Sequence, residues 1–459
     1  MNAFRFLIIS AVFLRFLSQD SWCQTRPTGS VQTGSVSPQP LPLSLAESID
    51  RGLKYNLAVL SGTQEERATA ALRLRALYEM YPKIHGDVSS TQEQINLAAF
   101  GFSGFPGQPQ IVGPFALIDA RARMTQSVFD RKLVHELREA KENERAASYA
   151  NANTRELVVL TVANFYLQAL AGASRIEAVE AQVKRSQAIG DRAVDLKNSG
   201  LVAGIDVLRS QVELRFQQQR LVSFRNEFEL AKLNLIRAIG VPLGQQIVLT
   251  DRMPVDSPAP ETLDAALQAA ERNRAELKRA EALLQAARYS IDAAHSEKLP
   301  TLDFAADYGT IGRTPTQNHG TYSMTGRIKI PVFNSNHRKT DEETAAARYE
   351  QRRLEAEDLK GRIEMEVRSA FLELQSASEL VRVAQSSIEL AKMQLDQAQD
   401  RFEAGVANNL EVVQAQEAVA LADETMISSL YSLNVAKAVL ARAMGIAEQT
   451  IKTYLGGKQ

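Results

Sequence analysis

Two stretches of the chain, DLKNSGLVAGIDVL (195–208) and DRFEAGVANNLEVV (400–413), share one pattern of helix, glycine break and helix. They lie at the centres of two longer segments, 162–241 and 367–446, which align without a gap. The segments also end alike, in AKLNLIRAIG (231–240) and AKAVLARAMG (436–445). A repeat of this length indicates one supersecondary unit built twice in one chain.

Each repeat is predicted to be a long helical hairpin with a tight tip. Proline is absent from 115–241 and from 332–459, and apolar residues recur there at alternating spacings of three and four. This is the seam that packs one helix against another at a shallow left-handed angle. Gly200 and Gly405 fit the positive-φ position that ends a helix. The arm before the first tip, about Arg131 to Asn198, would be about 100 Å long.

Before each long arm the period changes from that of a helix to that of a strand. In the second repeat apolar and polar residues alternate over 302–309 and 322–332, and in the first repeat over 118–128. The fourth strand, around 84–97, has a weaker pattern. Such alternation predicts strands with one apolar and one charged face. The charged positions expected to face water are Arg121, Arg123, Asp303, Asp307, Arg327 and Lys329.

These strands are long enough to cross an outer membrane, which takes about 9–11 residues. Four strands cannot close a barrel, since the smallest bacterial barrels have about 8, and open edges are not tolerated in lipid. If the strands form a membrane wall, several chains must therefore share it. The six charged positions would then face the lumen of the barrel. In a soluble sheet the same positions would simply be solvated.

The composition excludes several other classes of protein. The 459 residues carry a net charge of −1, with 53 basic and 54 acidic residues, so a nucleic-acid partner is disfavoured. The single cysteine, Cys23, allows neither an intrachain disulfide nor a cysteine metal site. The five histidines are scattered, and neither a nucleophile motif nor a phosphate-binding glycine loop is present. We expect no enzymatic activity, no cofactor and no metal.

The N-terminus has the features of a secretory signal peptide, with Arg5 before an apolar run over 6–14. Ser21 and Cys23 are small enough to flank a cleavage site, and lipidation of Cys23 is the alternative. The predicted organisation is a signal peptide (1–23), a disordered tether (24–42), a first repeat (43–241), a linker (242–260), a second repeat (261–446) and a C-terminal tail (447–459).

Two short motifs recur in this order. A glycine is followed six positions later by an acidic residue and aliphatics, at Gly200/Asp206 and Gly405/Glu411. An aliphatic-Phe-Asp/Asn step marks the change from strand to helix, at 128–130 and 332–334. With these motifs the chain resembles the TolC-like outer-membrane efflux proteins from about residue 43 to 445.

The resemblance implies a mainly α fold with a small β part. Long antiparallel coiled-coil hairpins would continue from four amphipathic strands contributed to a shared trimeric transmembrane barrel. It also implies a homotrimer in outer-membrane lipid with its helical tunnel in the periplasm. The protein would be a passive exit duct that receives small molecules or polypeptides from an inner-membrane pump and a periplasmic adaptor (membrane fusion protein).

The resemblance further assigns roles to residues near the tips. The residues implied to contact the adaptor are Gly200, Gly204, Gly405 and Asn408. Those implied to border the periplasmic aperture are Phe402, Glu411, Gln414, Asp206 and Arg209. The family has a second carboxylate where this chain has Gln414, which puts a family-style gate in question. The alternative for Glu411 is an ordinary acidic residue at a helix N-terminus, and for the glycines an ordinary turn.

Two other functions compete with the exit duct. A secreted coiled-coil structural or adhesive protein would not need amphipathic strands, which both repeats contain. A periplasmic adaptor would pair its hairpin with small β-domains, for which the sequence has no glycine-rich strand clusters.

Overall fold

The structure, a computed structural model, describes residues 28–101, 109–200, 202–254, 262–314, 316–332, 337–404, 406 and 409–454. It divides into two compact units. The first, called here the hairpin unit, draws on residues 1–61, 154–266 and 368–459. The second, called the sheet unit, draws on residues 62–153 and 267–367.

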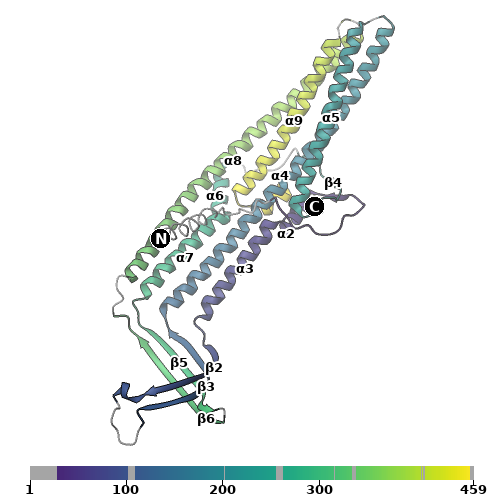
Figure 1. Ribbon diagram of the computed structural model, residues 1–459. Helices are drawn as coiled ribbons and strands as arrows, with labels where there is room; N and C mark the ends of the chain where they lie inside the picture. The colour runs from purple at the N-terminus through teal and green to yellow at the C-terminus, as the bar shows by residue number, and fades with distance from the viewer. Residues whose placement is uncertain are drawn as a thin grey trace, which may run out of the picture. The chain divides into compact units, whose positions relative to one another are not determined.

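Four long helices form the two predicted hairpins (Figure 1). The first hairpin joins α4 (Arg131–Asn198, 68 residues) to α5 (Gly204–Ile239), and the second joins α8 (His337–Glu403, 67 residues) to α9 (Asn409–Ala443). The near-equal lengths follow from the duplication, and the helices continue because no proline interrupts them. The mainly helical fold class with paired hairpins is confirmed.

Shorter helices precede each strand pair, as the duplication predicts. They are α2 (Leu45–Tyr55) and α3 (Leu57–Tyr78) in the first repeat, and α6 (Leu263–Asn273) and α7 (Ala275–Ser296) in the second. Helix α2 begins with a capping box, in which Ser44 and Glu47 satisfy each other's backbone N–H groups. The two helices of each pair are separated by a short break, at Asn56 in the first repeat and at Arg274 in the second. The buried Asn56 side chain donates a hydrogen bond to the carbonyl of Ala238 at 3.2 Å.

The segment expected to be a disordered tether is ordered over its described part, residues 28–42. Backbone hydrogen bonds join Val31 to Tyr55 and Thr33 to Gly240. The short strand β1 (Leu41–Leu43) then pairs in parallel with β4 (Ile247–Leu249). The expectation was wrong for these residues, because their backbone groups find partners in distant parts of the sequence that a local composition signal does not reveal.

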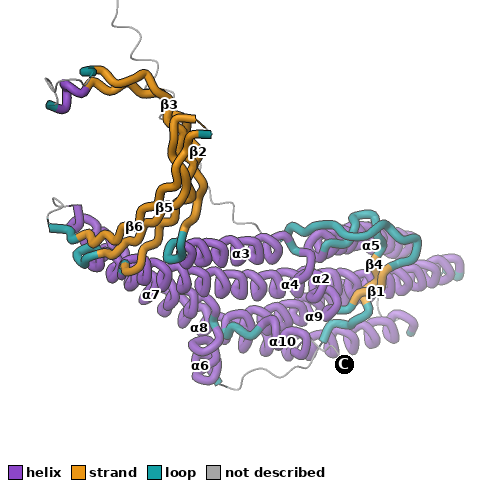
Figure 2. The backbone as a smooth tube through the Cα atoms, turned by 90° about the horizontal axis from the view of Figure 1, so that it is seen from below, coloured by secondary structure: helices purple, strands orange, loops and turns teal. Residues whose placement is uncertain are grey.

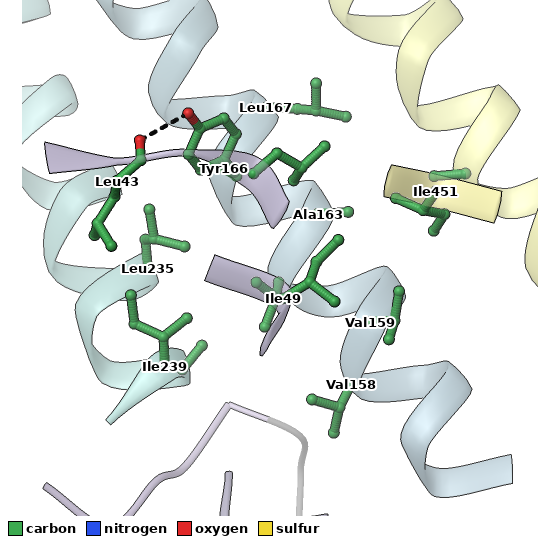
Figure 3. Close-up of a cluster of buried hydrophobic side chains, with 14 of the residues drawn as sticks. Leu43, Ile49, Val158, Val159, Ala163, Tyr166, Leu167, Leu235, Ile239 and Ile451 are labelled. Atoms are coloured by element: carbon green, nitrogen blue, oxygen red, sulfur yellow. Dashed lines mark hydrogen bonds between the residues drawn. The ribbon is translucent and has the colours of Figure 1, made fainter. Parts of the chain in front are cut away.

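The core of the hairpin unit gathers around Tyr166 (Figure 3). Its hydroxyl lies 3.0 Å from the carbonyl oxygen of Leu43 and 2.9 Å from Asp251 Oδ2. Burial raises the pKa of this hydroxyl, and the hydrogen bond to Asp251 raises it further. Burying apolar side chains stabilises the fold by about 1.5–3 kcal/mol each. Fully buried neighbours of Tyr166 include Ile49, Leu235 and Ile239.

The expected C-terminal tail contains a helix, α10 (Ala447–Tyr454), that contributes to this core. Ile451 is buried, and the carboxylate of Glu156 accepts a hydrogen bond from the backbone N–H of Ala447 at 2.7 Å. This carboxylate satisfies an N–H group that the first turn of a helix leaves unpaired. The tail is thus part of the folded unit over its described residues.

The sheet unit contains one four-stranded antiparallel sheet in the order β2-β3-β5-β6 (Figure 2). Its strands are β2 (Lys83–Asn96), β3 (Ile111–Phe129), β5 (Thr301–Thr314) and β6 (Gln317–Lys329). A short 3-10 helix, η2 (Leu97–Phe100), follows β2. Strands β3 and β5 pair with each other, so the sheet joins the two repeats at its centre. Strands β2 and β6 are left as its edges.

Candidate functional site

The first hairpin ends in the glycine turn that its sequence predicts. Gly200 has φ +75°, and its N–H donates to the carbonyl of Lys197 at 2.9 Å. A residue with a side chain rarely adopts this φ, which explains the glycine. Gly204 is the first residue of α5. Gly405 and Asn408, the corresponding predictions at the second tip, lie outside the described residues.

The two acidic residues expected near the aperture each lie beside an arginine. Asp206 Oδ1 is 3.4 Å from Arg209 Nη1, and the Asp206 side chain is only 14% exposed. Glu411 Oε2 is 3.6 Å from Arg401 Nε, and the Glu411 side chain is 45% exposed. Gln414 is exposed on the same helix as Glu411. The more accessible carboxylate is therefore that of the second tip.

Phe402, also expected near the aperture, lies in the apolar interior of the tips. Its side chain is buried at 7% exposure in an apolar cluster that includes Val412 and Val419 of α9 and Leu395 of α8. Leu196 of α4 packs against the same cluster. Within its own chain the aromatic ring therefore packs between the two tips, and its role at the aperture stays a prediction. Sequence spacing does not distinguish a residue that lines the aperture from one that packs between the tips. In both cases the aromatic residue lies one helical turn before the glycine of the tip.

Sequence reasoning missed a layer of buried polar side chains in the hairpin unit. Its members come from three helices: Gln182 and Ser186 of α4, Ser210, Glu213 and Gln217 of α5, and Gln416 of α9. Gln217 Nε2 donates to Glu213 Oε1 at 2.7 Å. The available signal was the presence of Ser210, Glu213 and Gln217 at helical spacing on the face of α5 that also carries the buried Val207.

The strand register places all six charged positions predicted for the sheet on one face. Asp303 lies opposite Arg327, and Asp307 lies opposite Arg123. Members of the set on the same strand are separated by an even number of positions, which keeps them on the same face. Directly opposed residues of an antiparallel pair project from the same face. Arg121 Nη1 is 3.0 Å from Asp307 Oδ1 and also pairs with Asp119. Arg123 pairs with Asp87 of β2 at 3.3 Å.

The opposite face of the sheet is apolar and exposed. Six of its large apolar side chains retain 67–82% of their accessible surface: Ile84, Val88, Tyr308, Tyr322, Met324 and Ile328. Large apolar patches that remain exposed on a soluble protein are interaction sites or membrane surfaces. This sheet thus has the two faces that a membrane β-wall requires, one apolar and one polar.

Helix α4 contains a stretch that is long and apolar enough to cross a membrane, but 56% of that window is buried within the protein. It supplies Val158, Val162 and Tyr166 to the core, which accounts for its apolar character. Among the described residues, no three or more His, Cys, Asp or Glu side chains are grouped as a metal site would require.

An amphipathic sheet in one unit and long helical hairpins in the other are the features of one class of protein, the membrane channel that has both a membrane wall and a helical duct. The chain matches the family model described as outer membrane efflux protein over residues 117–241 and 266–446, and it belongs to this family. It is an outer-membrane channel protein, as the resemblance implied.

Curated relatives agree with this assignment. The pyoverdine export outer membrane protein OpmQ of Pseudomonas putida is 22% identical over 67% of this chain and 67% of its own length. The alkaline protease secretion protein AprF of Pseudomonas aeruginosa is 22% identical over 65% of this chain and 63% of its own length.

Solved structures share the fold. The MtrE outer membrane channel of Neisseria gonorrhoeae superimposes with a TM-score of 0.75 at 14% identity, over 91% of this chain and 95% of its own. The outer membrane protein VceC of Vibrio cholerae gives a TM-score of 0.74 at 14% identity, over 87% of this chain and 96% of its own.

Proposed function

We propose that this protein is the homotrimeric exit duct of a tripartite export system. An inner-membrane pump and a periplasmic adaptor deliver the cargo, and this chain supplies the passive route across the outer membrane. The observation that carries the proposal is the four-stranded sheet with one charged face, one exposed apolar face and two open edges. The proposed duct has no catalytic role and uses no cofactor.

The strand count supports a shared barrel. One chain supplies four strands, and the edges β2 and β6 leave backbone N–H and C=O groups that lipid cannot satisfy. Closed bacterial barrels have about 8 strands or more. Three copies would supply twelve strands, four from each, with β6 of one copy beside β2 of the next. The apolar face would then contact outer-membrane lipid.

The charged face would line the lumen of that barrel. Arg121, Arg123, Asp303, Asp307, Arg327 and Lys329 supply both signs of charge. A lining of mixed charge holds no single class of solute tightly, because each carboxylate has an arginine or lysine near it. The relatives' names mention the export of pyoverdine and the secretion of an alkaline protease. The cargo proposed for this chain is accordingly small molecules or polypeptides, selected by the pump.

The hairpin tips are the proposed contact with the adaptor. Gly200 and Gly204 lie at the end of the first hairpin, and Gly405 and Asn408 lie in sequence between the two helices of the second. Three copies of the exposed Glu411 would place negative charge around the aperture and favour cations there. Gln414 would add no charge to that ring, and the Asp206–Arg209 pair would add little net charge.

The first test is the native mass of the protein extracted from outer membranes in mild detergent, followed by conductance in a planar bilayer. We expect a trimer in the outer-membrane fraction that forms channels. A monomeric or dimeric protein in the soluble periplasm would overturn the proposal. A secreted coiled-coil structural or adhesive protein would then be the better account.

A further inference from the structure

The buried polar layer of the hairpin unit borders a small cavity. Its volume is about 10 Å³, which is about the least that holds one water molecule. Six polar side chains from α4, α5 and α9 line it: Gln182, Arg185, Ser186, Glu213, Gln217 and Gln416. Small cavities with polar walls hold ordered water in proteins, whereas apolar cavities stay dry.

Two polar atoms on the walls of this cavity have no hydrogen-bond partner among the residues that the structure describes. They are Oε1 of Gln182 and Nε2 of Gln416, which belong to residues only 6% and 8% exposed. Buried amide groups are almost always satisfied in folded proteins, because leaving one unpaired costs free energy. One water molecule satisfies both atoms, since it donates to the oxygen and accepts from the N–H group.

The two amides lie at the same level of a pair of antiparallel helices. Arg175 Nε of α4 is 2.8 Å from Glu424 Oε1 of α9, which fixes one point of the register between these helices. From this pair Gln182 is seven residues closer to the tip on α4, and Gln416 is eight residues closer on α9. Both steps are about two helical turns, so the two amides reach the cavity at the same height from different helices.

The charges around the cavity favour water over an ion. A cation would be repelled by Arg185, and an anion by Glu213, because both side chains line the cavity. Asp423 of α9 lies near enough to Arg185 and to Lys392 of α8 to interact with both charges. These four groups balance one another, so a neutral ligand fits the site.

We propose that one buried water molecule joins Gln182 of the first hairpin to Gln416 of the second, and that this hydrated layer fixes the register between the two hairpins. The site goes beyond the proposed export function and does not depend on it. One consequence does depend on it: because the register sets the relative levels of the two tips, it would decide whether both tips reach the adaptor together.

The apolar seam of α9 fixes the register only weakly. Its buried members are all small or β-branched: Val412, Ala415, Val419 and Ala422. A shift of about one turn along α9 would bring Val412 or Val419 opposite Gln182 in place of Gln416. The amide of Gln182 would then be buried without a partner. Single buried polar positions specify the register of coiled coils in the same way.

The first test is a density map of the protein, from crystals or by electron cryo-microscopy, at a resolution that shows ordered water. We expect one peak within hydrogen-bond distance of both Gln182 Oε1 and Gln416 Nε2. An empty cavity, or a direct bond between the two amides, would overturn the water site.

A double-mutant cycle measures the link between the two amides in solution. Methionine has about the length of glutamine but lacks the amide. Gln182→Met and Gln416→Met should each raise the equilibrium constant of unfolding about tenfold, because each leaves the opposite amide less well satisfied. The double variant should exceed either single variant by less than about threefold, since both amides act through one water. Effects that simply multiply would show that the amides are independent.

Gln211→Met is the matched control for this cycle. Gln211 aligns with Gln416 in the first repeat and is exposed on α5. Its replacement should change the equilibrium constant of unfolding by less than about twofold, as exposed substitutions usually do. An effect as large as that of Gln416→Met would mean that the loss at Gln416 does not come from the buried site.

The register itself is measured with a pair of spin labels on one chain. Arg192→Cys on α4 and Thr425→Cys on α9 are exposed positions. Counted from the Arg175–Glu424 pair, they lie about 27 Å apart along the helix axes, so a change of register appears as a change of distance. Dilution with unlabelled chains restricts the measurement to distances within one chain, and the unsubstituted chain reports on the natural Cys23.

The labelled parent protein should give one narrow distance. Adding Gln182→Leu and Gln416→Leu together should produce a second population shifted by about 5 Å, the rise of one helical turn. Gln211→Leu should leave the single distance unchanged. A single unchanged distance in the chain with both leucines would overturn the role in register.

These outcomes are separable from those of the export proposal. A trimeric channel in which no water joins the two amides would overturn the present inference and leave the exit duct standing. A soluble monomer that contains the water would overturn the exit duct alone.

Discussion

The two hairpins have similar helix lengths and turn glycines, but they bury different side chains. Aligned positions of the repeats carry polar residues in the first hairpin and alanine in the second: Ser186 and Ala391, Glu213 and Ala418, Gln217 and Ala422. The first of each pair belongs to the buried polar layer, and the second to the apolar cluster around Phe402. The duplication thus retained the turn glycines and helix lengths that determine the fold, while the faces that hold the tips together diverged.

The largest effect is expected where the second hairpin differs most from the first, at Phe402. Phe402→Ala would leave a cavity in the apolar cluster and lower the free energy of unfolding by about 3–5 kcal/mol. The aligned residue of the first repeat, Lys197, is exposed, so Lys197→Ala should change stability by less than about 0.5 kcal/mol. Denaturant unfolding followed by circular dichroism compares the two variants. Equal losses of unfolding free energy in the two variants would show that the buried Phe402 side chain does not stabilise the packing of the tips.

The buried pair Glu213–Gln217 gives the next comparison. Gln217→Ala removes the amide that donates a 2.7 Å hydrogen bond to the buried carboxylate of Glu213. The free energy of unfolding should fall by about 1–3 kcal/mol. Replacing both residues by alanine reproduces the aligned residues of the second repeat, Ala418 and Ala422. This double change should lower the free energy of unfolding by less than Gln217→Ala alone. A double-mutant cycle with Glu213→Ala measures the coupling. Additive losses would mean that the pair does not act as a unit.

The core provides a smaller comparison between the repeats. Tyr166 aligns with Phe371, which lacks the hydroxyl that lies close to Leu43 and Asp251. Tyr166→Phe should therefore lower the free energy of unfolding by about 0.5–1.5 kcal/mol, the net value of a typical hydrogen bond. Thermal unfolding of the two proteins under identical detergent conditions measures the difference. An unchanged midpoint would show that the N-terminal strand β1 is not held by this contact.

Much of the fold was predictable because it depends on periodic signals. The long arm was expected at about Arg131–Asn198, and α4 has these bounds. The strands were expected from alternation, and their register confirms that one face is charged. These predictions succeeded because helix and strand periods are local properties of the chain.

The missed features depend on partners distant in sequence. The segment 28–42 reads as a linker by composition, and its order comes from Tyr55, Gly240 and β4. The helix at 447–454 is held by Glu156, which belongs to the first repeat. Phe402 has the same tip spacing whether it faces a lumen or a neighbouring helix. The lumen and adaptor roles of the remaining site residues stay predictions, because they concern surfaces that other molecules would cover.

The smallest effect concerns the two acidic residues of the tips. Glu411→Gln should lower the preference of the open channel for cations, because Glu411 is the more exposed carboxylate. The change should be less than about fivefold, since a unit charge acting at about 4 Å through water is worth about 1 kcal/mol. Asp206→Asn should have a smaller effect, because Asp206 is 14% exposed and pairs with Arg209. Reversal potentials in a salt gradient measure both variants, and a larger shift for Asp206→Asn would mean that the first hairpin, not the second, borders the aperture.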